Sequence, residues 1–198
     1  MKTVQTIHMA TQQSPPTTVP VHKPSASEKL FFLISGIIVS VPLTLFIDNF
    51  ALPPLAALQI DPFVISTLVL APLIEEFAKA YPLFYRHGET ERSYITFGAL
   101  TGFGFGLAEF TLYVASGAPV SDRIFGLLFH TANTSIVAYG VSQNRTLPFY
   151  VIAVFLHLLA NLSAAFDLPA ISGLAATGIA VLLAWTLYNK TSERTVKY

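Results

Sequence analysis

The stretch YITFGALTGFGFGLAEFTLYVAS, residues 94–116, is long and apolar enough to cross a lipid bilayer as one helix, for which roughly 20 residues suffice. Gly98, Gly102 and Gly106 fall four residues apart, and Glu109 and Tyr113 continue the same helical face. Small residues at this spacing let two helix backbones approach closely, so we expect this face to be packed against a neighbour. Packing explains the glycines, but it does not explain a carboxylate on the same face.

The whole chain has the composition of a membrane protein. Of its 198 residues, 53% are hydrophobic and 11% are charged, against about 25% charged in an average soluble domain, and the mean hydropathy is +0.60. The formal net charge is zero, so nothing indicates nucleic-acid binding through a basic surface. Because the chain has no cysteine, disulfides, thiolate catalysis and cysteine-based zinc sites are excluded.

Six apolar runs follow one another along the chain, separated by short segments with turn and charge signals. They predict an all-α fold, a polytopic membrane bundle of about six transmembrane helices at residues 30–47, 62–85, 94–115, 124–143, 147–165 and 169–189. Thr, Ser, Gln and Pro dominate residues 1–28, which therefore read as a flexible N-terminal tail. The transmembrane domain then covers residues 29–190, and residues 191–198 form a short C-terminal tail.

Lysine and arginine are distributed unequally between the two ends of the predicted helices. With the N-terminus inside, the cytoplasmic side carries Lys2, Lys23, Lys29, Arg86, Arg92, Arg145, Lys190, Arg194 and Lys197. The opposite side receives Arg123, and Lys79 lies within a helix. Because basic residues favour the cytoplasmic side, the pattern predicts a multi-pass protein of the plasma membrane with both termini inside.

Residues 66–85, STLVLAPLIEEFAKAYPLFY, place three ionisable groups inside an apolar run. Such groups are costly within a membrane helix and usually face the bundle interior, so they indicate a functional site. Glu75 and Glu76 stand four and three residues before Lys79, and either can pair with it. The alternative is that Lys79 only neutralises a glutamate. Pro72, one turn earlier, removes a backbone donor and is expected to kink the helix.

The two adjacent glutamates cannot face the same neighbour, because consecutive helical residues point about 100° apart. Glu75 shares a stripe with Ala71 and Ala78, small residues beside which another helix can pack closely. Glu76 shares its stripe with Lys79. We therefore expect Glu75 to face the bundle centre as a catalytic base. Glu76 is expected to be a charge partner of Lys79 or an orienting second carboxylate.

Two later apolar runs carry imidazole and amide groups. His130 is followed one turn later by Asn133 and Thr134, and His157 is followed at i, i+4 by Asn161. Taken singly, each histidine is most simply a hydrogen-bonded interior residue. Four consecutive runs, however, contribute acid, imidazole or amide groups that can converge in the central to outer half of the bilayer.

Such a set of side chains suits the activation of water. A carboxylate takes the proton, and a histidine or asparagine stabilises the oxyanion of a tetrahedral intermediate. The same groups could instead hold zinc, with Glu109, His130 and His157 as the ligands if a metal is used. The spacing is not that of the HExxH motif of soluble zinc proteases, so the residues leave both chemistries open.

Four motifs in order resemble the PrsW family of intramembrane proteases, which is similar to the CAAX prenyl endopeptidases and bacteriocin-processing enzymes. They are the EEFAK segment from Glu75 to Lys79, GFGFGLAEFTLY with Glu109 and Tyr113, then His130, and finally His157 with Asn161. The resemblance covers roughly residues 66–165. Each motif is weak alone, whereas four in order on four predicted membrane helices are fairly specific.

The resemblance implies hydrolysis of a peptide bond within or beside the membrane. It implies that the substrate is a membrane-anchored protein, of the anti-sigma-factor kind in PrsW itself. The catalytic residues carried over are Glu75, Glu76, Glu109, His130, His157 and Asn161. Members of the family are classed as metalloproteases, while the related CAAX enzymes suggest a glutamate-activated water without an obligatory metal.

Two other functions remain for a chain of this kind. A non-enzymatic scaffold or immunity-type protein of the same fold is one, but it would need none of the acids and imidazoles that the sequence retains. A small proton-coupled transporter using the buried carboxylates is the other, and the absence of an evident inverted repeat weighs mildly against it. The substrate, the oligomeric state and the side to which the site opens are not determined by the sequence.

Overall fold

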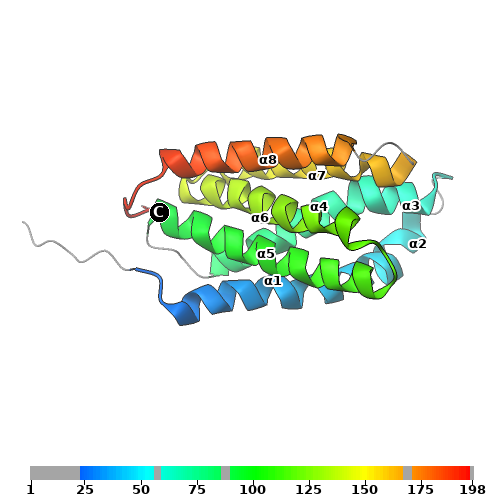
Figure 1. Cartoon of the computed structure of the whole chain (residues 1–198), viewed down its shortest axis with the longest axis horizontal. Coiled ribbons are helices and arrows are strands. Elements are labelled where there is room, and N and C mark those ends of the chain that lie inside the picture. Colours follow the sequence, from blue (N-terminus) through cyan, green and yellow to red (C-terminus); the bar gives the residue numbers. More distant parts are fainter. Residues whose placement is uncertain (1–22, 56–58, 86–89, 167–170, 197–198) are drawn as a thin grey trace, which may run out of the picture.

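A computed structural model describes residues 23–55, 59–85, 90–166 and 171–196 of the chain (Figure 1). Every named secondary-structure element in these ranges is a helix, which confirms the all-α prediction. Two of the elements, η1 and η3, are π-helical. In chain order the elements are α1 (Ala26–Phe46), η1 (Ile47–Ala51), α2 (Leu52–Leu55), α3 (Pro62–Ile65), η3 (Ser66–Leu70), α4 (Ala71–Tyr85), α5 (Glu91–Ala115), α6 (Val120–Ser142), α7 (Thr146–Phe166) and α8 (Ile171–Lys190).

The elements join into six rods within the described residues, and these correspond to the six predicted apolar runs. The first rod is longer than predicted at both ends, because α1, η1 and α2 run on continuously to Leu55. Four helices in the described ranges are long and apolar enough to cross a membrane: Ala26–Leu55, Glu91–Ala115, Val120–Ser142 and Thr146–Phe166. The protein is therefore a multi-pass membrane protein. Six crossings with both termini inside stay a prediction.

The predicted N-terminal tail lies outside the described residues up to residue 22, and its end is already helical. Ser25 caps α1, because its hydroxyl accepts from the backbone N–H of Glu28 at 3.2 Å while the Glu28 carboxylate accepts from the Ser25 N–H at 2.7 Å. This reciprocal arrangement is a capping box. It starts the helix at Ala26, a few residues before the expected boundary at 29.

The C-terminal segment is packed against the start of α5 as far as residue 196. Thr195 and Thr90 form an isolated antiparallel bridge, and the Glu91 N–H donates to the Arg194 carbonyl at 3.0 Å. The Arg194 guanidinium also pairs with the Glu91 carboxylate at 3.1 Å. Residues 197 and 198 of the predicted tail lie outside the described ranges.

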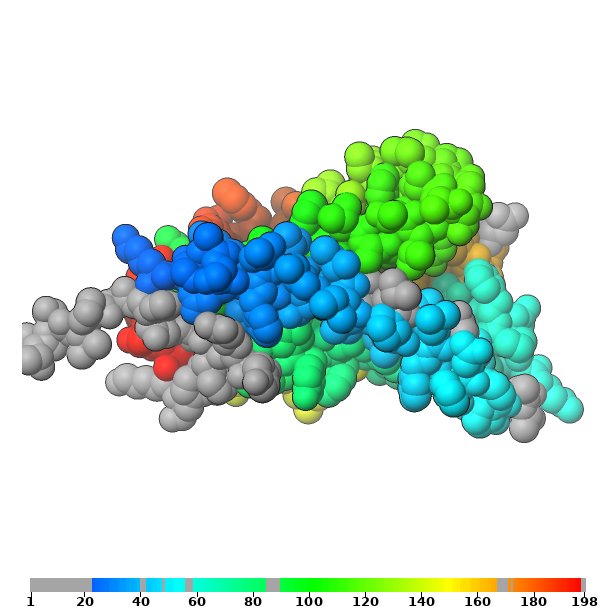
Figure 2. All heavy atoms as spheres, turned by 90° about the horizontal axis from the view of Figure 1, so that it is seen from below, coloured from blue at the N-terminus to red at the C-terminus, as the bar shows by residue number. Residues whose placement is uncertain are grey.

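Helix α5 lies between α1 and α6, and glycines let it approach both (Figure 1). A Cβ at Gly102 would lie 2.2 Å from the His130 carbonyl oxygen on α6, and one at Gly104 would lie 2.1 Å from the Leu33 carbonyl oxygen on α1. No side chain fits at either distance. The predicted packed face is confirmed, since Cβ atoms at Gly98 and Gly106 would also meet residues of α6. Figure 2 shows α1 lying across one side of the bundle, with the α5–α6 end projecting beside it.

We expect Gly104→Ala to lower the free energy of unfolding by about 1–3 kcal/mol, because the added methyl group overlaps the α1 backbone. The measurement is a denaturing-detergent titration of the purified protein in micelles. Gly178→Ala is the matched control on α8, because a Cβ there meets nothing within 4 Å. Equal stability of the two variants would contradict the close α1–α5 contact.

Candidate active site

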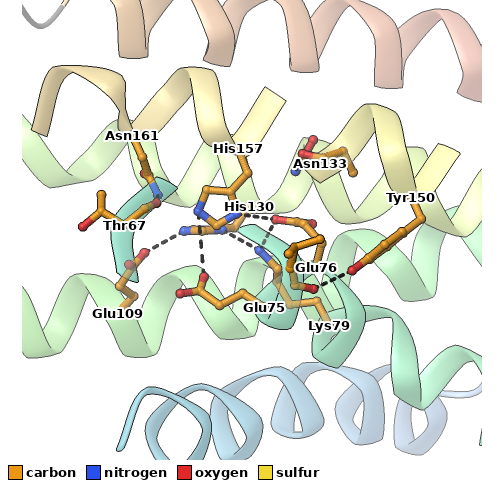
Figure 3. A network of polar contacts seen from close by, with 12 residues as sticks. Thr67, Glu75, Glu76, Lys79, Glu109, His130, Asn133, Tyr150, His157 and Asn161 are labelled. Carbon is orange, nitrogen blue, oxygen red and sulfur yellow. Dashed lines mark hydrogen bonds and ion pairs between the residues drawn. The ribbon is translucent and has the colours of Figure 1, made fainter. Parts of the chain in front are cut away.

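Four helices bring acidic, basic and imidazole side chains together in the interior of the bundle (Figure 3). All six residues that were predicted to be catalytic lie in this cluster, together with Lys79. Glu109 and Asn161 are partly exposed, whereas the others are buried. The cluster consists of Glu75, Glu76 and Lys79 of α4, Glu109 of α5, His130 of α6, and His157 and Asn161 of α7.

The Lys79 ammonium connects three of the four helices. Its Nζ donates to Glu76 Oε1 at 2.6 Å and to His130 Nδ1 at 2.9 Å, and it lies 4.6 Å from the centre of the Phe105 ring. Because an ammonium only donates, His130 Nδ1 accepts, and the proton of the neutral ring is on Nε2. That Nε2–H donates to Glu109 Oε2 at 2.6 Å. Lys79 thus does more than neutralise a glutamate, since it also orients His130.

His157 is oriented by the same carboxylate oxygen. Its Nδ1–H donates to Glu76 Oε1 at 2.7 Å, so this one oxygen receives both the lysine and the imidazole. The other ring nitrogen, Nε2, is then an acceptor and lies 3.9 Å from Glu75 Oε2. The His130 and His157 rings lie 5.5 Å apart at 75°, so the two imidazoles are in edge-to-face contact.

The two glutamates differ in their surroundings in the way the helical stripes predict. Glu76 is fully buried and pairs with Lys79, which confirms the expected charge pair. The Oε2 atom of Glu75 is buried and has no hydrogen-bond partner among the described residues. Such an atom costs free energy unless it meets a water or a cation. The Oε2 atom of Glu76 is likewise buried without a partner, but its Oε1 receives both Lys79 and His157, whereas Glu75 accepts no hydrogen bond from the described residues. Glu75 is therefore the carboxylate that is free of hydrogen bonds.

The position of Asn161 depends on the backbone around Pro72. In the π-helical turn η3 the Ala71 N–H donates to the Ser66 carbonyl, and Pro72 has no N–H to offer. The Thr67 carbonyl has thereby lost both of its usual donors. Asn161 Nδ2 donates to that carbonyl at 2.9 Å. The distortion that the sequence predicts at Pro72 is this π-helical turn, which ties α7 to the rod that carries the glutamates.

A cavity of about 570 Å³ adjoins the cluster. It lies at the end of the bundle where α5 turns into α6 and α8 begins, and small side chains of α7 and α8 form much of its wall. Four of the cluster residues line it, whereas Glu75, Glu76 and Lys79 are not among its lining residues. The four are Glu109, His130, His157 and Asn161.

Comparison with protein-family models gives one match that covers most of the chain. The model for PrsW family intramembrane metalloproteases matches residues 26–188. The chain belongs to this family. The resemblance read from residues 66–165 is thereby confirmed, and the match extends it to α1 and α8. Neither the comparison with curated proteins nor that with solved structures finds a match.

The metalloprotease description of the PrsW family raises the question of which residues could hold an ion. Ligand atoms of Glu75, Glu109 and His130 lie within 4.8 Å of one another. Carboxylate oxygens and imidazole nitrogens are ligands that zinc accepts, and the unpartnered Glu75 Oε2 fits a cation. The set differs from the predicted one, because Glu75 takes the place of His157. His157 is instead bonded to Glu76 through Nδ1, and its Nε2 lies 3.9 Å from Glu75 Oε2.

Three contacts of this PrsW-family site were not predicted from the sequence. The Lys79–His130 bond joins different helices, so helical spacing could not indicate it. The Thr67 carbonyl could have been found, because a proline stands five residues after it. Tyr150 donates to the Leu73 carbonyl at 2.6 Å and fastens α7 to α4, and no sequence signal marks it.

We expect Lys79→Met to lower the free energy of unfolding by about 3–5 kcal/mol, because it leaves the buried Glu76 carboxylate without a counter-charge. Detergent or urea titration in micelles measures the loss. Lys29→Met, at an exposed position of α1, is the control and should stay within about 0.5 kcal/mol. Adding Glu76→Gln to Lys79→Met should recover part of the loss. A double variant less stable than Lys79→Met would contradict the pairing.

Proposed function

We propose that this protein is an endopeptidase that hydrolyses a peptide bond of a membrane-anchored protein, with Glu75 as the general base. The observation that carries the proposal is the pair of acceptors Glu75 Oε2 and His157 Nε2, which lie 3.9 Å apart, with His157 in the wall of the cavity. Two acceptors at this distance cannot hydrogen-bond to each other. Two such acceptors can bind a group that carries two hydrogens or a positive charge. A water molecule has two hydrogens to donate, so the nucleophilic water can bind here.

The contacts around Glu75 and His157 indicate the roles of the other residues. Glu76 holds His157 through Nδ1 and keeps the Nε2 lone pair directed toward Glu75. Proton transfer from water to the Glu75 carboxylate then generates the nucleophile that attacks the scissile carbonyl. Lys79 provides the counter-charge of Glu76 by direct contact. His157 is well placed to share the proton and pass it to the departing amine.

Two donors are available to the oxyanion of the tetrahedral intermediate. Asn161 uses one N–H on the Thr67 carbonyl, and its amide carries a second N–H beside the cavity. The Nε2–H of His130 also lies at the cavity and is held by Glu109. Donors fixed in advance by such contacts stabilise developing charge without reorganising during the reaction.

We further propose that Glu75, Glu109 and His130 hold a divalent cation, zinc being the metal that suits these ligands. When bound, the ion supplies Lewis acidity for the scissile carbonyl. A cation bound at His130 Nε2 would replace the bond to Glu109 and the proposed oxyanion role of this N–H, and the ring proton would then be on Nδ1, which could no longer accept from Lys79. The Lys79–Glu76–His157 contacts would be unaffected. A metal-free mechanism would rely on the same Glu75 as base.

The proposed substrate belongs to the membrane-anchored proteins, of the anti-sigma-factor kind by analogy with PrsW. Its cleaved segment would enter the cavity at the α5–α6 end of the bundle. In the orientation that the basic residues favour, with six crossings in the plasma membrane and both termini inside, that end faces outward. The cleaved bond would then lie in the outer half of the bilayer or just beyond it.

We expect Glu75→Gln and His157→Ala each to reduce cleavage at least about a hundredfold, because each removes one of the two facing acceptors. The measurement compares membrane-protein fragments by proteomics between cells that express the wild type and cells that express a variant. Glu193→Gln, at the opposite end of the bundle, is the control. Detergent titration should show that all the variants fold and insert.

Unchanged fragments in both site variants would rule out the proposed chemistry. If those variants also retained the cellular function, a non-enzymatic scaffold would be favoured. Transport by the purified protein in liposomes would instead favour the proton-coupled carrier.

We expect the purified wild type to contain about one equivalent of zinc per chain, and Glu109→Gln to lose most of it. Elemental analysis by mass spectrometry measures the metal. Asp122→Asn, an acid at the cavity rim outside the candidate ligand set, should retain it. A wild type without metal that still cleaves would establish the metal-free mechanism.

A further inference from the structure

The cavity extends from the reactive groups along α6 toward the first turn of that helix. His130, Gly126 and Arg123 all line it. Gly126 precedes His130 by four residues and Arg123 precedes it by seven, so the three lie on one helical face. The rise from His130 to Arg123 is about 10 Å at about 1.5 Å per residue.

Among the described residues, none packs against the position where a side chain at Gly126 would begin. A Cβ built there meets no atom within 4 Å, although Gly126 is part of the cavity wall. The other glycines of the bundle core behave differently, since Gly102 and Gly104 each lie directly against a neighbouring backbone. Packing therefore does not require glycine at 126, and its effect is to leave the cavity open between His130 and Arg123.

The Arg123 side chain is held at the rim by an aromatic ring. Its guanidinium lies 3.7 Å from the centre of the Tyr113 ring, a cation–π contact that fixes its position without satisfying its hydrogen-bond donors. Among the described residues no carboxylate lies within ion-pair distance of it. The adjacent Asp122 accepts from the Ser121 hydroxyl at 2.9 Å instead. The guanidinium thus remains able to bind an anionic group.

We propose that Arg123 is a specificity-determining residue that binds an acidic side chain of the substrate about three residues from the scissile bond. The spacing follows from geometry, because an extended chain advances about 3.3 Å per residue and the path is about 10 Å long. The substrate segment passes over Gly126 on its way from the reactive groups to the rim. This inference rests on the proposed peptidase function and adds the class of sequence that the enzyme selects.

The test uses fluorescent single-span peptides in which one Asp, Ser or Lys stands at successive positions of the polar flank. Their binding to full-length Glu75→Gln protein in micelles is measured by fluorescence anisotropy. We expect Asp at one position to bind about tenfold more tightly than Ser there, as for a hydrogen-bonded charge pair. Adding Arg123→Gln should abolish this preference, and adding Arg123→Glu should transfer it to Lys.

Matched variants separate the subsite from general effects on folding. Arg145→Gln, just beyond the opposite end of α6, should leave the Asp preference unchanged. Gly126→Leu should weaken binding of every peptide about tenfold, whereas Gly178→Leu on an exposed face of α8 should not. Equal binding of Asp and Ser peptides, an Asp preference that survives Arg123→Glu, or full binding by Gly126→Leu would each overturn the inference.

Cleavage by the wild type is followed on the same peptides by mass spectrometry. Cleavage three residues from the preferred Asp supports both the subsite and the peptidase. Selective binding without cleavage supports the subsite and counts against the proposed function. Cleavage at a site that does not depend on the position of Asp overturns the proposed subsite but still supports the peptidase function. The failure of one proposal is therefore distinguishable from the failure of the other.

Discussion

The buried ion pair between Lys79 and Glu76 is the contact on which the rest of the site depends. A charge in the dry interior of a membrane protein must be paired, and Lys79 satisfies its ammonium on Glu76 and His130 at once. Through these two bonds α4 fixes an imidazole on α6, and through Glu76 it fixes another on α7. Lys79 and His157 both donate to the Oε1 atom of Glu76, whose Oε2 stays unpartnered, and Glu75 accepts no hydrogen bond from the described residues. One ion pair thus distinguishes the glutamate that joins the helices from the glutamate that we propose as the base.

Side-chain contacts as short as these require the backbones to be close and correctly phased. Glu109 reaches His130 because α5 and α6 pack so closely that only glycine fits between their backbones. A Cβ at Gly102 would overlap the His130 carbonyl. Asn161 reaches the rod of the glutamates because Pro72 deprives the Thr67 carbonyl of a backbone donor. In both places a residue without a reactive group, a glycine or a proline, determines where a reactive one lies. Substitutions at such positions therefore disturb the site from outside it.

Much of this arrangement could be predicted from the sequence, because the information is local. Apolar length predicts the helices, and an acid or imidazole in an apolar run predicts an inward-facing group, as at Glu109 and His157. The angle of about 100° between consecutive helical residues predicted that Glu75 and Glu76 have different neighbours. What depends on contacts between helices could not be predicted in this way. The proton position on His130 follows from Lys79, the candidate metal set contains Glu75 in place of His157, and Tyr150 carries no signal of its own.

The bridge between Thr90 and Thr195 constrains how the chain is threaded through the bilayer. Two segments that share backbone contacts must lie on the same side of the membrane, so the chain between them crosses an even number of times. Three helices in that interval, α5, α6 and α7, are long and apolar enough to cross. If each of them does, an even number requires that α8 cross as well, although α8 is not among the four candidates found in the described residues. Backbone contacts at the end of the chain thereby restrict the number of membrane crossings between residues 90 and 195 to an even number.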